Sequence, residues 1–205
     1  MHREYQGFDR HGSVAEYSAA TIPAGRSLQD NRIGYDLRMA QTFSFDVTST
    51  IDLQEVDNAV NQAKKEIAQR YDFKGSLATI ELDQKAGTLT LTAENAFKLG
   101  AVWEVVQTRL VRRNVPVKNM KPADPEAAGA GTMKQIVTLQ QGIPSDAARE
   151  IVKYLKDGKM KKVQASIQGD QLRIASSSKD DLQDAMAALR EHDFGVALQF
   201  GNYRS

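Results

Sequence analysis

Residues 43–205 contain the same order of secondary-structure patterns twice. In each half, a strand pattern is followed by a helix, two strands, a second helix and a last strand. Apolar residues at alternate positions predict strands, and apolar residues three and four positions apart predict helices. The β-α-β-β-α-β order defines the split βαβ, or ferredoxin-like, unit. The sequence therefore predicts an α+β protein with two ferredoxin-like (RRM-like) domains.

The first predicted domain spans residues 42–120. Phe43, Phe45 and Val47 alternate with polar residues and predict its opening strand. Helical spacing of apolar residues follows from residue 52 to residue 71. The remaining elements are expected to be strands at residues 76–82 and 88–92, a helix at 95–113 and a short strand at 115–120.

The second predicted domain spans residues 133–205, after a segment without periodicity. That segment, residues 121–132, has two prolines and two glycines and predicts a linker. Gly169-Asp170 is a two-residue hairpin loop that suits a type I′ or II′ turn. The expected elements are a strand at 133–140, a helix from its N-cap Ser145 to 157, strands at 163–168 and 171–175, a helix capped by Ser178 and a strand at 197–203.

Residues 1–41 differ from the rest of the chain. The first 38 residues hold five arginines and five acidic residues and show no apolar period, so we expect a disordered N-terminal extension. A stronger form of this expectation is that translation begins at Met39. The segment lacks the apolar core of a secretory signal and is too acidic for a transit peptide, which predicts a cytoplasmic protein.

The amino-acid composition argues against several classes of function. The 27 basic and 26 acidic residues give a formal net charge of +1, which is not that of a strongly basic nucleic-acid clamp. The chain has no cysteine and three histidines, so thiolate chemistry is excluded and the common general base is scarce. No phosphate-binding loop or metal-ligand spacing occurs. We therefore expect no enzyme, no metal and no cofactor.

The second hairpin offers polar side chains for a ligand. Val163, Ala165 and Ile167 are expected to face the core with Leu172 and Ile174. The opposite face then carries amides and one guanidinium, which can contact bases and phosphate. A two-residue loop pairs Gln168 with Gln171 and Ser166 with Arg173. An ordinary solvated sheet face explains the same pattern.

Basic residues gather before the second strand of each half. Lysines at helix C-termini are favoured by the helix dipole, and they also suit phosphate. The candidate nucleotide-binding residues are Lys74, Lys159, Lys161, Lys162, Gln164, Gln168, Gln171 and Arg173.

Aromatic residues are absent from both predicted hairpins. RNA-recognition sheets stack bases on strand aromatics, so this mode of binding is disfavoured. The aromatics gather instead at Phe43/Phe45, Tyr71/Phe73, Phe97/Trp103 and Phe200/Tyr203, and most are expected in the core.

Several long motifs resemble the YajQ family of bacterial nucleotide-binding proteins. They cover residues 45–59, 70–75, 162–173, 180–183 and 198–204, and the resemblance extends over residues 42–205. It implies two ferredoxin-like domains that exchange their N-terminal strands, with residues 43–50 in the second sheet and 133–140 in the first. It also implies nucleotide binding. Members have been linked to ATP or GTP, to tRNA and to cyclic di-GMP, which alters association with a transcription regulator.

Two hypotheses of function follow. The first is a cytoplasmic, non-catalytic nucleotide-binding protein that senses cyclic di-GMP, ATP or GTP. The second is an RNA- or protein-binding adaptor that uses the paired sheets. Steep salt dependence would distinguish polyanion binding from binding of a small nucleotide.

Overall fold

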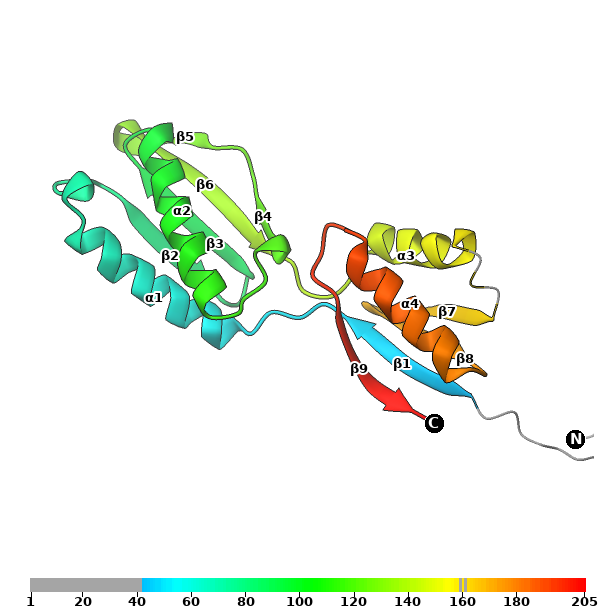
Figure 1. The fold of residues 1–205 in the computed structure, drawn as a ribbon. Helices are drawn as coiled ribbons and strands as arrows, with labels where there is room; N and C mark the ends of the chain where they lie inside the picture. The colour runs from blue at the N-terminus through cyan, green and yellow to red at the C-terminus, as the bar shows by residue number, and fades with distance from the viewer. Residues whose placement is uncertain (1–41, 159, 161) are drawn as a thin grey trace, which may run out of the picture. The chain divides into compact units, whose positions relative to one another are not determined.

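The structure is a computed structural model that describes residues 42–158, 160 and 162–205 (Figure 1). The predictions for residues 1–41, including a start at Met39, therefore lie outside the described residues. The described residues form two antiparallel sheets and four α-helices. In the described ranges, no helix is both long and apolar enough to span a membrane.

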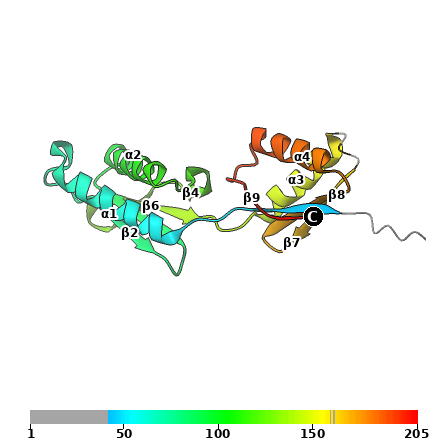
Figure 2. The same cartoon turned by 60° about the horizontal axis from the view of Figure 1, so that its bottom comes forward.

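Sheet A has the strand order β7-β8-β1-β9. Its strands are β1 (Phe43–Thr48), β7 (Val163–Gln168), β8 (Gln171–Ser176) and β9 (Gln199–Arg204). The helices α3 (Ser145–Asp157) and α4 (Lys179–Glu191) cover one face of this sheet (Figure 2). Phe45, Val47 and Ile174 point toward these helices and are buried, which leaves the opposite face of sheet A open.

Sheet B has the strand order β2-β3-β6-β4, and β5 pairs with β6. Its strands are β2 (Thr79–Asp83), β3 (Thr88–Ala93), β4 (Met120–Pro122), β5 (Glu126–Ala128) and β6 (Thr132–Leu139). The helices α1 (Leu53–Gln69) and α2 (Ala96–Arg112) pack on one face of it. Their apolar stripes form a second core with Leu89, Leu91 and Val137.

β1 and β6 are both inner strands of their sheets. β1 lies between β8 and β9, and Phe45 is opposite Ile174. β6 lies between β3 and β4, and Leu89 is opposite Val137. Sheet A therefore depends on a strand that is distant in sequence from its neighbours, whereas the strands of sheet B follow one another along the chain.

Residues 121–132 contain more regular structure than the sequence indicates. β4 ends in this segment, β5 lies wholly within it, and a short 3₁₀-helix, η3, spans Gly129–Gly131. Ala127 is opposite Met133, so the segment adds an edge to sheet B. Prolines are tolerated on edge strands because the N–H they lack is not needed there.

Several predicted boundaries were wrong. The expected strand at 115–120 is replaced by a 3₁₀-helix, η2 (Val117–Asn119), and β4 starts only at Met120. α1 ends at Gln69 and is followed by the 3₁₀-helix η1 (Tyr71–Phe73), and β2 starts at Thr79. Pro144 is the N-cap of α3, so Ser145 is its first residue.

The predicted cap of α4 and the predicted hairpin loop agree with the structure. Ser178 Oγ accepts a hydrogen bond from the Asp181 N–H and caps α4. Gly169 has φ of +67° and Asp170 does not have positive φ, which fits a type II′ turn.

Asn119 is fully buried where three connecting segments meet. Its Nδ2 donates to Ser49 Oγ at 2.8 Å and to the Gln140 carbonyl at 3.2 Å. Its Oδ1 accepts from the Ala197 N–H at 2.8 Å. One amide thus holds the ends of β1 and β6 and the approach to β9.

Candidate functional site

The predicted polar side chains lie on the open face of sheet A. Gln168 is opposite Gln171 and Ser166 is opposite Arg173, as the loop length predicted. Leu172 and Ile174 alternate with them in β8 and are buried, which confirms the division of this strand between two faces. Ile167 is an exception: it lies near the end of an edge strand and 47% of it is exposed.

Arg173 forms a bidentate salt bridge, referred to below as the fork, with Asp46. The sequence did not predict this pair. Arg173 Nε donates to Asp46 Oδ1 at 2.8 Å, and Nη2 donates to Oδ2 at 3.1 Å. Asn202 Nδ2 donates to the same carboxylate. The hydrogen bonds from Arg173 and then Asn202 lower the pKa of Asp46 against the effect of its burial. The same fork raises the pKa of Arg173, so both groups stay charged.

A groove of about 390 Å³ surrounds this ion pair. β1 supplies Asp46 and Thr48, β8 supplies Gln171 and Arg173, and β9 supplies Arg204. Asp46 and Arg173 cancel in charge, and Arg204 leaves the groove with one net positive charge. The groove can accept hydrogen-bonding groups and an anion.

Of the other predicted nucleotide-binding residues, only some lie near this groove's sheet. Lys162 is exposed immediately before β7, and Gln164 in β7 is opposite Ala175. Lys159 and Lys161 lie outside the described residues. Lys74 follows η1 in the part of the chain that forms sheet B, so it does not belong to the face that carries the glutamines.

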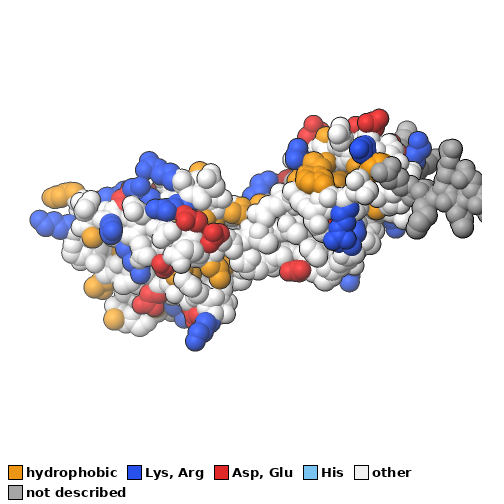
Figure 3. Space-filling model, turned by 90° about the horizontal axis from the view of Figure 1, so that it is seen from below, with side chains coloured by type: hydrophobic (Ala, Val, Ile, Leu, Met, Phe, Trp, Pro, Cys, Tyr) orange, Lys and Arg blue, Asp and Glu red, His pale blue; other side chains and the backbone are white. Residues whose placement is uncertain are grey.

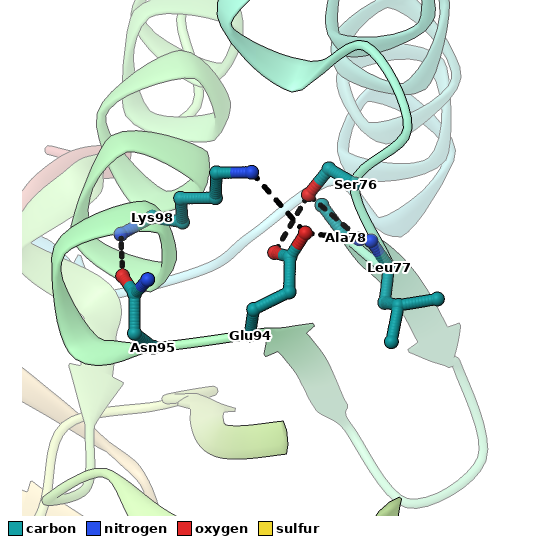
Figure 4. Close-up of polar contacts among 6 residues, drawn as sticks. All are labelled: Ser76, Leu77, Ala78, Glu94, Asn95 and Lys98. Carbon is teal, nitrogen blue, oxygen red and sulfur yellow. Dashed lines mark hydrogen bonds and ion pairs between the residues drawn. The ribbon is translucent and has the colours of Figure 1, made fainter. Parts of the chain in front are cut away.

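A carboxylate ties the segment before β2 to the first turn of α2 near Lys74 (Figure 4). Glu94 accepts hydrogen bonds from Ser76 Oγ at 2.7 Å, the Leu77 N–H at 3.0 Å and Lys98 Nζ at 3.2 Å. The hydrogen bond from Ser76 is the largest contribution that lowers the pKa of Glu94 to about 2. These contacts fix the position of the segment that follows Lys74 and precedes β2.

Exposed aromatic rings occur close to this network in the sequence. Tyr71 is 89% exposed and Phe97 is 86% exposed, so these two rings lie outside the core, in which most of the aromatics were expected. Tyr71 lies in η1 and Phe97 in the first turn of α2. Unpartnered aromatics of this kind are enriched where proteins bind partners.

A pocket of about 540 Å³ lies between α4 and the strands β1 and β9. It combines aromatic, aliphatic and basic side chains, which include Phe43, Phe45, Lys179, Met186, Arg190, Tyr203 and Arg204. Arg204 also borders the groove on the open face. Met186 is partly buried and packs against the core of sheet A. The available sequence signal was the spacing of Lys179, Met186 and Arg190, which places them along one side of α4.

His192 is the only histidine within the described residues. It follows α4, stacks on Tyr154 with 4.4 Å between ring centroids, and lies 3.7 Å from Glu150. These contacts join the end of α4 to α3. No group of three or more metal-ligating side chains occurs among the residues the structure describes.

Basic and acidic side chains are interspersed on the face shown in Figure 3. No single large basic area dominates that face, which agrees with the near-neutral composition.

A family model described as "Nucleotide-binding protein YajQ-like" matches residues 43–204. This chain belongs to the YajQ-like family. A relative from Elusimicrobium minutum is 48% identical over 162 residues, which are 79% of this chain and 98% of that protein. Relatives from Acidithiobacillus ferrooxidans and Chloroherpeton thalassium are 47% identical over 161 residues and 45% identical over 166 residues. They cover 78% and 81% of this chain and 98% and 100% of their own lengths. All three relatives are named nucleotide-binding protein, and the family resemblance seen in the sequence is confirmed.

Proposed function

We propose that this chain is a cytoplasmic protein that binds a nucleotide without converting it. The observation that supports this function best is the open face of sheet A, where amide side chains border a groove with a net positive charge. The names of the family relatives agree with it. The proposed ligands are ATP, GTP or cyclic di-GMP, and the proposed role is that of a sensor.

The proposed contacts to the nucleotide are of two kinds, amide contacts to base or ribose and cationic contacts to phosphate. Gln164, Gln168 and Gln171 present amides that can donate to and accept from base edges or ribose. Lys162, with Lys159 and Lys161, supplies ammonium groups for phosphate. Arg173 uses Nε and Nη2 for Asp46, so its contribution to a ligand would come from Nη1, and it also positions the groove. Lys74 would serve a separate contact in the part that forms sheet B.

We also propose that the two halves are ferredoxin-like units with exchanged first strands. This proposal is supported by the strand orders β7-β8-β1-β9 and β2-β3-β6-β4, in which β1 and β6 are each third. In each case its neighbours are antiparallel. Domains at residues 42–120 and 133–205 would then each complete the other's sheet.

The lowered pKa values of four carboxylates favour binding over acid–base catalysis. A general acid or base works best when its pKa is near the operating pH. The pKa of Asp46, Asp72, Glu94 and Asp193 is in each case lowered, by hydrogen bonds from arginine, serine or backbone donors. Such carboxylates remain ionised at neutral pH and are poor proton donors.

A thermal-shift panel with ATP, GTP, cyclic di-GMP and a short RNA tests this function. At 100 times the dissociation constant a ligand should stabilise the fold by about 2.7 kcal/mol. Chromatography of the recovered nucleotide should show no product. No shift with any nucleotide, or turnover of the ligand, would overturn the proposal.

The exposed rings Tyr71 and Phe97 favour a second candidate function, an RNA- or protein-binding adaptor. Binding of a short RNA should weaken steeply as salt rises, because several counterions are released. Loss of RNA binding in a Tyr71→Ala variant with nucleotide binding intact would support the adaptor. Equal RNA binding by that variant and the wild type would oppose this role for Tyr71.

A further inference from the structure

The pocket between α4, β1 and β9 has the chemistry of a nucleoside phosphate site. We infer that it binds the base of a nucleotide against Tyr203 and Phe43 and its phosphate on Lys179, Arg190 and Arg204. This inference rests on the proposed nucleotide binding. It adds a site on the helix-covered side of sheet A that is separate from the open face with the glutamines.

The apolar part of the pocket suits a flat aromatic ring. Tyr203 is 62% exposed although its ring contacts Phe45, with 6.2 Å between ring centroids. Its hydroxyl donates to the Met186 sulfur at 3.7 Å, which holds the ring against α4. Phe43 lines the pocket from β1. Aromatic faces and a polarisable thioether are surfaces on which nucleobases stack with little dependence on base identity.

The charged part of the pocket suits an anion. Lys179, Arg190 and Arg204 line it, and its lining contains no Asp or Glu side chain, although the last residue of the given sequence, Ser205, also lies at the wall. None of the three cations forms an ion pair with another described residue. This differs from Arg109 and Arg113, which are paired with Glu66 and Glu55. Three cations at one pocket, with no ion-pair partner among the described residues, attract an anion and give it charge-assisted hydrogen bonds.

The aromatic rings also position two of these cations. Lys179 Nζ lies 4.9 Å from the centroid of Phe43, and the Arg190 guanidinium lies 5.1 Å from that of Phe200. Cation–π contacts of this length restrict long side chains without neutralising them. The cations therefore remain available for phosphate at the rim of an aromatic slot, and the volume of about 540 Å³ is within the range of small-molecule sites.

The pocket adjoins the open-face groove through Arg204, which lines both. This residue lies at the end of the edge strand β9. A nucleotide in the pocket would place its phosphate close to the groove. Variants on the two sides of sheet A can therefore be compared with one ligand.

Isothermal titration calorimetry with ATP and GTP, and with adenosine and inorganic triphosphate as fragments, tests the inference. Tyr203→Ala should weaken nucleotide binding about fivefold or more because a stacking surface is lost. Tyr203→Phe retains the ring and should bind like the wild type. Lys179→Ala and Arg190→Ala should each weaken binding roughly tenfold to a hundredfold and leave adenosine affinity unchanged. Lys153→Ala on α3 is the matched control, because Lys153 is exposed and does not line the pocket.

The outcomes separate this inference from the proposed function. If the wild type binds neither nucleotide, the proposed function fails. If the wild type binds, but Tyr203→Ala and Lys179→Ala match Lys153→Ala, the pocket is not the site and the proposed function stands. Circular dichroism melts of every variant establish that the fold is retained, and the Tyr203→Phe comparison remains informative if Tyr203→Ala does not fold.

Discussion

Replacing Asn119 with alanine should destabilise the fold strongly without changing its surface. The side chain is 0% exposed and makes three hydrogen bonds, to Ser49, Gln140 and Ala197. Each bond contributes about 1 kcal/mol net, so their sum is about 3 kcal/mol. The Ser49 hydroxyl is also fully buried, and loss of its partner adds to the cost because a buried polar group is left unsatisfied.

Thermal unfolding followed by near-ultraviolet circular dichroism measures this effect. For a domain of about 150–250 residues, 1 kcal/mol shifts Tm by about 2–4 °C, so Asn119→Ala should melt about 6–12 °C lower. The control is Asn61→Ala, because Asn61 is exposed on α1 and its side chain bonds to Asp57, one turn away on the same helix. It should change stability by no more than about 0.5 kcal/mol. Equal melting temperatures for the two variants would refute the reasoning that Asn119 fixes the three connecting segments.

Three further predictions concern acid, backbone and charge. Glu94 has a folded pKa of about 2, below its ordinary 4.5, so its contribution to stability is complete above pH 4.5 and is lost as pH falls toward 2. In urea titrations the stability gap between the wild type and Glu94→Gln should therefore narrow from pH 5 to pH 2, and a constant gap would contradict this. Gly142 has φ of +73° and no space for a Cβ, so Gly142→Ala should lower Tm, whereas Gly129→Ala should not. Equal melts would refute the strain argument. Arg173→Ala leaves the buried Asp46 carboxylate without its fork, so it should lower stability in urea, and adding Asp46→Asn should restore part of it. No recovery in the double variant would count against the pair.

The sequence predicted local structure better than long-range contacts. The hairpin around Gly169 followed from loop length and alternation, and its strand pairs agree with the structure. The α1 and α2 stripes likewise follow from spacing within one element. Such patterns are set by neighbours in the chain, so one sequence is enough to read them.

The features that were missed join distant positions. Asp46 and Arg173 are 127 positions apart, and Asn119 and Ser49 are 70 apart. Nothing in a single sequence indicates that a strand arginine will pair with an aspartate in another strand. The exposure of Ile167 and Tyr203 depends in the same way on which strand lies at a sheet edge.

The pocket was missed because its residues come from three elements. Phe43, Met186 and Tyr203 each fit an ordinary core position when read alone. Only the pairing of β1 with β9, and the packing of α4 beside them, brings these side chains to one wall. The cations then gain a role that their places in the sequence do not indicate.

Calorimetric titration of the wild-type chain with ATP, GTP and cyclic di-GMP, followed by chromatography of the ligand, tests the central claim most directly. Saturable heat with at least one of them, and recovery of that nucleotide unchanged, is the predicted result. Absence of heat with all three, or conversion of the bound nucleotide to a product, would contradict it.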